Sequence, residues 1–322
     1  MITIKNTEQI KNMKEAGHIA YNLLNLLEGY VKEGITTKRL DEVAYKFITK
    51  NEATPSFLNY EGYPASICVS INEEVVHGIP GSRKIKSGDV VSIDVGVCKN
   101  GVHADTARTY IVGSTIKEVK DLVENTKKAL YEGIKIVKPG IKLNEVCKKI
   151  ESVAKEHNYG VIRELTGHGV GTSLHEDPYI PNYSNKESES IILKPGMTLA
   201  IEPMFALRSR EIYLLEDGWG IITQDESVAA HFEHSIVVTE DGYEILTGEW
   251  VMAKKDYIEL EGKVIELLPR GEFKVQIENG HTVVAYVSGK MRNFNIRILA
   301  GDTVLMEVPL TDLKHGRIIY RK

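Results

Sequence analysis

Apolar residues recur at helical spacing twice in the first 250 residues, and a Val-Lys-x-Gly-Ile segment precedes them each time. An apolar residue at about every third or fourth position predicts an amphipathic helix. The two segments are 31–35 and 137–141, and the apolar positions that follow them are Leu40, Val43 and Phe47 in the first copy and Val146, Ile150 and Val153 in the second. The predicted helices therefore correspond, which indicates an internal repeat.

A strand that ends in an acid follows each of these helices. A Lys-x-Gly segment and a run of apolar residues lead to Asp94 in the first copy and to Glu202 in the second, 108 residues further on. A third match pairs Asp105 with Glu233, each followed by an apolar strand pattern, at an offset of 128. Two halves, each with a helix, an antiparallel sheet and two carboxylates, predict an α+β domain with pseudo-twofold symmetry and a site between the halves.

The last 70 residues have a different pattern. From Ile258 onward polar and apolar positions alternate, and an Asn-Gly pair at 279–280 is a strong hairpin signal. About five strands fit, so a small Greek-key barrel is the economical fold. The segment 252–255 reads like the start of an independent protein, and charge changes there too, from net −8 over residues 1–251 to net +3 over residues 252–322. We expect one domain at 1–249 and a second at 252–322.

Composition narrows the possible environments. Of 322 residues, 42% are hydrophobic and 26% are charged, which argues against a disordered or collagen-like chain. The apolar stretches are broken within about ten residues, whereas a membrane-spanning helix needs about 20. The N-terminus lacks a basic region followed by an apolar one, and three widely spaced cysteines suit free thiols in a reducing compartment. We expect a cytoplasmic protein without a membrane partner.

The two aspartates of the first half are predicted to lie on one face of a hairpin. Asp94 lies in a strand whose flanks are too apolar for a solvated surface acid, and a turn at Asn100-Gly101 brings the chain back. A two-residue turn would pair Asp94 with Ala107 and leave Asp105 diagonal to it, whereas a slip of two residues would pair the acids directly. The alternative is one structural acid and one surface acid, which the repeat disfavours.

Four acids at one seam require a cation, because like charges at short range force one of the groups to bind a proton. His168, in a glycine-rich segment, adds an imidazole, although a lone histidine there is more often a turn residue. Four carboxylates and one imidazole nitrogen are enough for two divalent ions, with manganese, iron or cobalt favoured and zinc and nickel left open. The predicted ligands are Asp94, Asp105, His168, Glu202 and Glu233.

Residues 1 to about 249 resemble a bacterial type I methionine aminopeptidase, a metallopeptidase with the pita-bread fold. The motifs that carry the resemblance stand in the family's order, and they are 75–80 (VVHGIP), 92–96 (SIDVG), 104–109 (ADTART), 167–171 (GHGVG), 175–176 (HE), 201–204 (IEPM) and 232–234 (FEH). The resemblance implies the same five ligands, with Asp94 bidentate to one ion and Asp105 and Glu233 bridging. It also implies removal of the initiator methionine from nascent polypeptides when the second residue is small.

The resemblance assigns further roles. It makes His77, His175 and Glu202 catalytic: the two histidines contact the substrate, and Glu202 also moves the proton. Taken alone, the histidines would read as a loop residue and a helix-start residue. The implied methionine pocket consists of Phe57, Tyr60, Tyr63, Cys68, Leu174 and Trp219, where aromatics alone would indicate core packing. Leu174 replaces a frequent aromatic and His231 a usual glutamine, and the interval between His175 and Glu202 is too short for the insertion of type II enzymes.

Residues 252 to 322 resemble bacterial translation initiation factor one, through the start at 252–254, the turn at 278–281, the segment 288–292 and the ending at 316–318. The resemblance implies an OB-fold that binds the small ribosomal subunit and its 16S rRNA. Basic and aromatic residues alternate in 289–297, as nucleic-acid-binding barrels require, although a solvated surface run is the alternative. The implied RNA contacts are Lys290, Arg292, Arg297 and Arg317. Tyr286 stands where the family more often has histidine.

The sequence thus predicts a monomeric fusion of an aminopeptidase and a ribosome-binding module. One alternative is a ribosome-binding protein whose peptidase half has lost catalysis, which the five filled ligand positions disfavour. Another is a proline-directed or creatinase-like peptidase of the same fold. Those enzymes carry a large N-terminal domain, whereas the first helix here is expected near Thr7.

Overall fold

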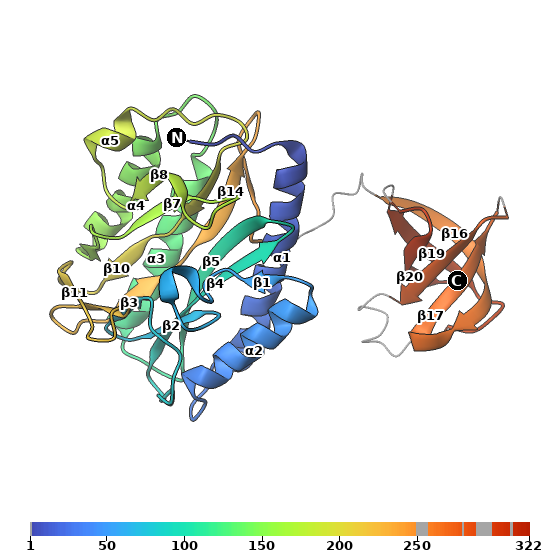
Figure 1. Cartoon of the computed structure of the whole chain (residues 1–322), viewed down its shortest axis with the longest axis horizontal. Helices are drawn as coiled ribbons and strands as arrows, with labels where there is room; N and C mark the ends of the chain where they lie inside the picture. The colour runs from blue at the N-terminus through green and yellow to red at the C-terminus, as the bar shows by residue number, and fades with distance from the viewer. Residues whose placement is uncertain (1, 249–256, 279, 288–297, 310–311) are drawn as a thin grey trace. The chain divides into compact units, whose positions relative to one another are not determined.

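The computed structural model describes residues 2–248, 257–278, 280–287, 298–309 and 312–322 (Figure 1). The chain divides into two compact units, Met1–Trp250 and Val251–Lys322. Each unit has hydrophobic cores of its own. Within the described residues, no helix combines the length and the apolar composition that a bilayer crossing requires.

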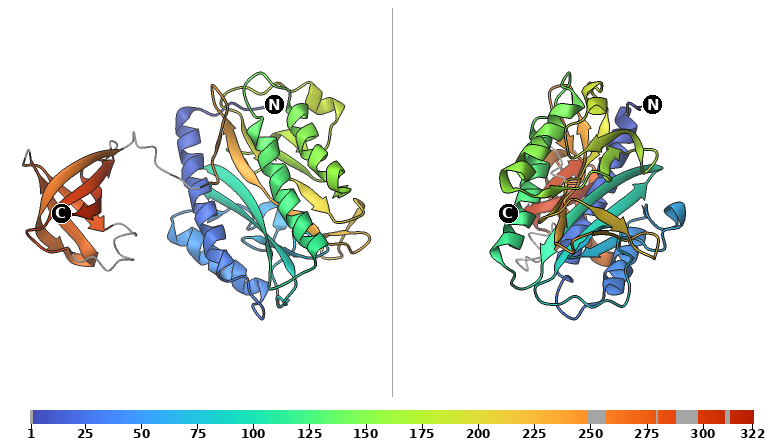
Figure 2. Two further views of the ribbon diagram at one scale, coloured as in Figure 1. Left: turned by 180° about the vertical axis from the view of Figure 1, so that it is seen from behind. Right: turned by 90° about the vertical axis from the view of Figure 1, so that its left-hand side faces the viewer.

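The helices of the first unit cover one face of its strands, which lie behind them in the back view of Figure 2. They are α1 (Thr7–Glu28), α2 (Thr37–Lys50), α3 (Lys117–Lys135), α4 (Leu143–His157) and the short α5 (Lys186–Glu189). Helix α1 begins with a capping box, because Asn6 Oδ1 accepts from the Gln9 N–H and Gln9 Oε1 accepts from the Asn6 N–H. Helix α2 begins similarly at the Thr36 side chain.

A long hairpin forms the centre of the first half. Its strands are β4 (Val90–Lys99) and β5 (Val102–Ile111). Asn100 and Gly101 both have positive φ, at 52° and 76°, as a two-residue turn of this hand requires. Asp94 pairs with Ala107 and Gly96 with Asp105, so the structure selects the register in which the two aspartates are diagonal.

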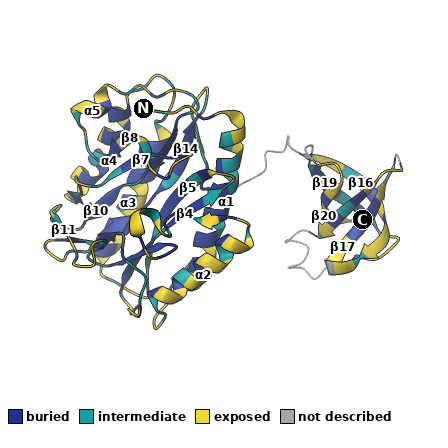
Figure 3. Cartoon of the chain, in the orientation of Figure 1, coloured by how far each residue is buried: buried dark blue, intermediate teal, exposed yellow. Residues whose placement is uncertain are grey.

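The second half repeats this arrangement. Strands β9 (Thr198–Ile201) and β14 (His234–Val238) pair antiparallel, as β4 and β5 do. One core lies between α1, α2 and the first hairpin, and a second lies between α3, α4 and the strands of the second half. The central strands are buried and the outer faces of the helices are exposed (Figure 3). The predicted α+β fold with two related halves is confirmed.

Shorter strands extend and connect the halves. Strands β1 (Thr54–Pro55) and β2 (Cys68–Ile71) flank β4, and β14 and β9 lie in a sheet of order β15-β14-β9-β7-β8. Two further sheets have the orders β13-β10-β6 and β11-β12-β3. The bounds are β3 (Glu74–Val76), β6 (Gly160–Val161), β7 (Thr166–Gly169), β8 (Glu176–Pro181), β10 (Met204–Ala206), β11 (Ile212–Leu214), β12 (Ile221–Thr223), β13 (Ala229–His231) and β15 (Tyr243–Ile245).

The second unit is a closed five-stranded barrel of order β16-β17-β18-β20-β19, which confirms the predicted all-β fold. Burial alternates along β17 and β18, as expected where one face of a strand points into a barrel core. Strand β20 pairs parallel with β18 and antiparallel with β19. The bounds are β16 (Tyr257–Leu268), β17 (Glu272–Ile277), β18 (Thr282–Val287), β19 (Thr303–Pro309) and β20 (His315–Arg321).

Candidate active site

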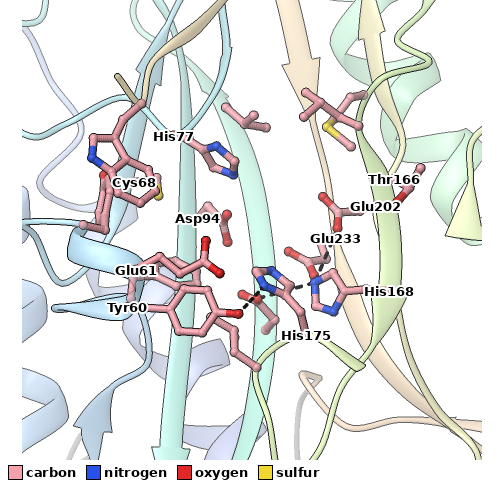
Figure 4. Close-up of a pocket in the computed structure, with 18 of the residues that line it drawn as sticks. Tyr60, Glu61, Cys68, His77, Asp94, Thr166, His168, His175, Glu202 and Glu233 are labelled. Atoms are coloured by element: carbon pink, nitrogen blue, oxygen red, sulfur yellow. Dashed lines mark hydrogen bonds and ion pairs between the residues drawn. The ribbon is translucent and has the colours of Figure 1, made fainter. Parts of the chain in front are cut away.

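A cavity of about 500 Å³ lies in the first unit and collects residues from both halves (Figure 4). All the residues that the sequence predicts for the metal site, for catalysis and for the methionine pocket line this cavity. They are Phe57, Tyr60, Tyr63, Cys68, His77, Asp94, Asp105, His168, Leu174, His175, Glu202, Trp219 and Glu233. The structure thus brings together segments that are up to 176 residues apart in the sequence.

The four acids meet where the two halves join. Glu202 directly follows β9 and Glu233 directly precedes β14, and the pairing of Ile201 with His234 places the two glutamates side by side. The Glu233 N–H donates to the Ala107 carbonyl at 3.0 Å, and the Thr106 hydroxyl donates to the Glu233 carbonyl at 2.8 Å. Hydrogen bonds to the main chain of Glu233 therefore hold the acids of one half against those of the other.

The carboxylates are short of hydrogen-bond donors. Asp94 Oδ1 and Glu233 Oε1 are buried without a hydrogen-bond partner among the described residues. Burial, together with Asp105 and Glu202, raises the pKa of Asp94 well above its ordinary value. Burial and the Glu202 charge raise the pKa of Asp105 to about 7. Such a cluster is costly unless cations neutralise it, so the donor set fits divalent metal ions.

His168 presents a ring nitrogen to these acids. Its Nδ1 lies 2.8 Å from the Gly169 carbonyl, which makes Nδ1 the donor and leaves the lone pair on Nε2. Nε2 lies 3.6 Å from Glu202 Oε1 and 3.9 Å from Asp105 Oδ2. Burial first, and then the nearby His175, lower the pKa of His168 to about 3, so the ring is neutral, as a metal ligand must be.

His231 is a site residue that the sequence analysis treated only as a substitution next to Glu233. Its Nε2 lies 3.2 Å from Glu202 Oε2 without hydrogen-bond geometry, and it could hold a metal ion together with Glu202 and Glu233. A second possible group joins Asp105, His168 and Glu233. The sequence could have indicated this role, because residues two apart in an extended segment share a face and His231 is two residues before Glu233.

The two histidines predicted to be catalytic, His77 and His175, lie on loops that reach into the cavity. His77 follows β3 with φ of +60°, and burial lowers its pKa to about 4. Gly78 follows His77, and its carbonyl accepts a hydrogen bond from the Tyr63 hydroxyl at 3.0 Å, which holds this loop in place. His175 precedes β8, and its Nδ1 lies 2.9 Å from the Tyr60 hydroxyl. Burial also lowers the pKa of His175.

An apolar cluster forms one wall of the cavity. Phe57, Tyr63, Cys68 and Leu174 are buried in it, and Trp219 packs edge-on against Tyr63 with 5.1 Å between ring centroids. Burial raises the pKa of the Cys68 thiol well above its ordinary value, so the thiol stays neutral. The structure therefore places the six predicted pocket residues together, in a setting suited to an uncharged side chain.

The predicted RNA-contacting residues of the second unit are placed only in part. Arg317 is exposed on β20, where its guanidinium donates to Glu307 Oε2 at 3.1 Å. It pairs across the ladder with Tyr286, whose side chain is 48% exposed. Lys290, Arg292 and Arg297 lie outside the described residues.

Comparisons with known proteins agree with this geometry. Residues 11–240 match metallopeptidase family M24, and residues 248–322 match the family of translation initiation factor 1A / IF-1. Methionine aminopeptidase 1 of Bacillus subtilis is 47% identical over 247 residues, which are 77% of this chain and 99% of the relative. The methionine aminopeptidase of Escherichia coli is 43% identical over 248 residues, which are 76% of this chain and 94% of the relative.

Solved structures separate the close from the distant relatives. The crystal structure of methionine aminopeptidase from Thermotoga maritima has a TM-score of 0.76 and 44% identity, and the match covers 77% of this chain and all of that one. The Xaa-Pro dipeptidase from Bacillus anthracis has a TM-score of 0.61 and 26% identity, and the match covers 76% of this chain and 62% of that one. The chain therefore belongs to metallopeptidase family M24, as a metalloaminopeptidase with an added domain of the initiation factor 1A / IF-1 family.

Proposed function

We propose that the first unit, residues 1–249, binds two divalent metal ions and removes the initiator methionine from nascent polypeptides when the second residue is small. The observation that carries this proposal is the convergence of four carboxylates, two of them buried, and one neutral imidazole on a single cavity, with two carboxylate oxygens lacking partners among the described residues. When bound, the ions supply a water activated near neutral pH. The proposed ligands are Asp94, Asp105, His168, Glu202 and Glu233.

The chain's own residues bind and orient the substrate. The apolar cluster around Tyr63 and Trp219 packs against the methionine thioether and excludes water. A ring N–H of His175 donates a hydrogen bond to the carbonyl oxygen as that oxygen gains negative charge, an interaction commonly worth about 100-fold or more in rate. His77 holds the scissile amide, and Glu202 carries the proton to the leaving nitrogen.

Metal content and turnover together test the metal site. Alanine at Asp105 or His168 should remove both metal and activity, whereas His175→Ala should retain the metal and lose about 100-fold in turnover. Asp89→Asn is the matched control, because Asp89 is a buried acid directly before β4 whose carboxylate accepts from the Lys86 N–H and from Asn72. Full activity and full metal content in Asp105→Ala would contradict the dinuclear site.

Peptide libraries test specificity. Metal-loaded protein should cleave Met-Ala-Ser efficiently and should leave peptides that begin with Leu or Pro intact. Large second residues should be rejected, because the scissile bond must approach the ligand cluster closely. Efficient cleavage of Met-Lys or Met-Phe peptides would refute the proposed restriction.

We also propose that the second unit, residues 252–322, binds rRNA of the small ribosomal subunit. Its family match and closed barrel support this role. Binding of the full chain to isolated small subunits should weaken steeply with salt, because each neutralised phosphate releases counterions. Replacing Lys290, Arg292 and Arg297 together with glutamate should abolish binding to the small subunits. A matched triple reversal at the exposed residues Lys120, Lys128 and Lys138 of the first unit should not, and equal loss in both variants would reject the assignment.

A further inference from the structure

The Tyr60 hydroxyl points at the ring of His175, and both side chains line the cavity (Figure 4). The oxygen lies 2.9 Å from His175 Nδ1, and the two rings meet edge to face with 5.2 Å between centroids. Among the described residues, no hydrogen-bond partner of His175 Nε2 is found. One ring nitrogen is therefore engaged by the protein, and the other is left for a substrate.

The backbone around Tyr60 is built to present this side chain. Asn59, Glu61 and Gly62 all have left-handed φ values, at 66°, 49° and 93°. Left-handed conformations of residues other than glycine are strained and persist only where surrounding contacts hold them. Here the Asn59 N–H donates to the Tyr63 carbonyl at 2.8 Å and the Tyr63 N–H to the Tyr60 carbonyl at 2.9 Å, which closes the turn on itself.

The direction of the Tyr60–His175 bond decides which nitrogen carries the proton of a neutral imidazole. A phenol hydroxyl can donate or accept, and a neutral ring has one donor and one acceptor nitrogen. Burial raises the pKa of Tyr60, so the hydroxyl keeps its hydrogen. If the hydroxyl donates, Nδ1 is the acceptor and the ring proton resides on Nε2.

We propose that Tyr60 is a positioning residue, which donates to His175 Nδ1 and so keeps the ring proton on Nε2, the nitrogen that the protein leaves free. This inference rests on the proposed function, in which His175 donates to the substrate carbonyl oxygen. An Nδ1–H ring would instead offer a lone pair to that oxygen, which repels developing negative charge. Tyr60 thus does more than line the methionine pocket.

Kinetics of Tyr60→Phe separate the two roles, because the phenyl ring stays in the pocket and only the hydroxyl is lost. We expect kcat to fall about 10-fold, equivalent to about 1.4 kcal/mol, with KM for a methionine peptide changed by less than about twofold. Tyr63→Phe is the matched comparison. Its hydroxyl lies in the same pocket but donates to the carbonyls of Ile67 and Gly78.

A double-mutant cycle identifies the residue through which Tyr60 acts. In a His175→Ala background, Tyr60→Phe should cause no further loss of kcat. Any change in kcat that Tyr63→Phe causes in the parent chain should be the same in this background. Full activity of His175→Ala would refute the proposed role of His175 itself. If His175→Ala shows its expected loss, two results would overturn the positioning role alone. One is no effect of Tyr60→Phe in the parent chain, and the other is an effect of Tyr60→Phe that persists in the His175→Ala background.

Nitrogen NMR of the full chain gives a readout that does not depend on turnover. In the metal-free protein labelled at its histidine ring nitrogens, we expect His175 as the neutral Nε2–H tautomer, and we expect Tyr60→Phe to shift it toward a mixture of tautomers. His175→Ala assigns the signal. An Nδ1–H tautomer in the parent chain, or no change in Tyr60→Phe, would overturn the inference.

Discussion

Breaking the buried ion pair between Lys5 and Glu176 is expected to destabilise the first unit and to disturb the neighbouring residue His175, for which we propose a catalytic role. Lys5 Nζ lies 2.5 Å from Glu176 Oε2, and the two side chains are only 3% and 8% exposed. The other carboxylate oxygen accepts from the Thr172 hydroxyl at 3.1 Å and from the Ser173 N–H at 3.0 Å. The pair therefore joins the N-terminal segment to the loop that carries His175.

The size of the effect follows from burial. Removing one partner of a buried pair typically costs about 3–5 kcal/mol, because the remaining charge is left uncompensated. Because Glu176 keeps its other hydrogen bonds in Lys5→Met, we expect a loss of stability near the lower end of this range, at about 3 kcal/mol. For a unit of this size, about 2–4 °C is lost per kcal/mol, so the melting temperature should fall by about 6–12 °C. Lys5→Met combined with Glu176→Gln should recover part of this loss, because no buried charge remains.

Calorimetry of the full chain measures the transition of the first unit, and peptide cleavage reports on His175. Burial alone would raise the pKa of Glu176, but hydrogen bonds from Lys5, Thr3 and the Ser173 N–H lower it to about 2. The pair's contribution is therefore complete above about pH 4.5 and declines as pH falls toward 2. The difference between parent and Lys5→Met should shrink over that interval. A difference below about 1 kcal/mol at pH 7, or one that grows on acidification, would refute the reasoning.

Other perturbations test the cavity and the seam between the halves. Asp105→Asn should raise the melting temperature of the metal-free chain at pH 8 while abolishing metal binding, because it removes an acid whose negative charge is repelled by the neighbouring carboxylates; a lower melting temperature would count against that view. Gly96→Ala should raise KM for methionine peptides, because its Cβ would lie 2.7 Å from the Phe57 ring; an unchanged KM would show that the ring moves freely. Thr109→Val should cost about 1–3 kcal/mol in calorimetry, because its hydroxyl both donates to the His231 carbonyl and accepts from the His231 N–H.

The elements with a clear periodicity in the sequence are those that could be predicted. Side chains alternate strictly along a strand, so Asp94 and Asp105 had to share a face in any register that differs by two residues. The hairpin turn at Asn100-Gly101 then selects the diagonal register. Apolar periodicity likewise identifies α2 and α4 as equivalent, and both pack onto the strands that carry the acids.

Contacts between irregular segments could not be predicted in this way. Tyr60 and His175 are 115 residues apart, and Lys5 and Glu176 are 171 residues apart. Loop segments have no periodicity that specifies where a side chain points, so these pairs become visible only when both loops are placed against the strands. His231 is intermediate, because alternation relates it to Glu233 but does not reveal that it reaches Glu202.

The seam between the halves explains how a folded chain tolerates four like charges in one cavity. The Asp105 N–H donates to the Ser235 hydroxyl at 2.9 Å, and the Glu233 N–H donates to the Ala107 carbonyl at 3.0 Å. These bonds use the main chain of the acids and leave the carboxylates free, so they persist whether the carboxylates are charged, protonated or bound to metal. The backbone thus fixes the spacing of the proposed ligands in advance and holds them together against their repulsion. If the acids bind metal as we propose, each of them should lower the stability of the chain without metal.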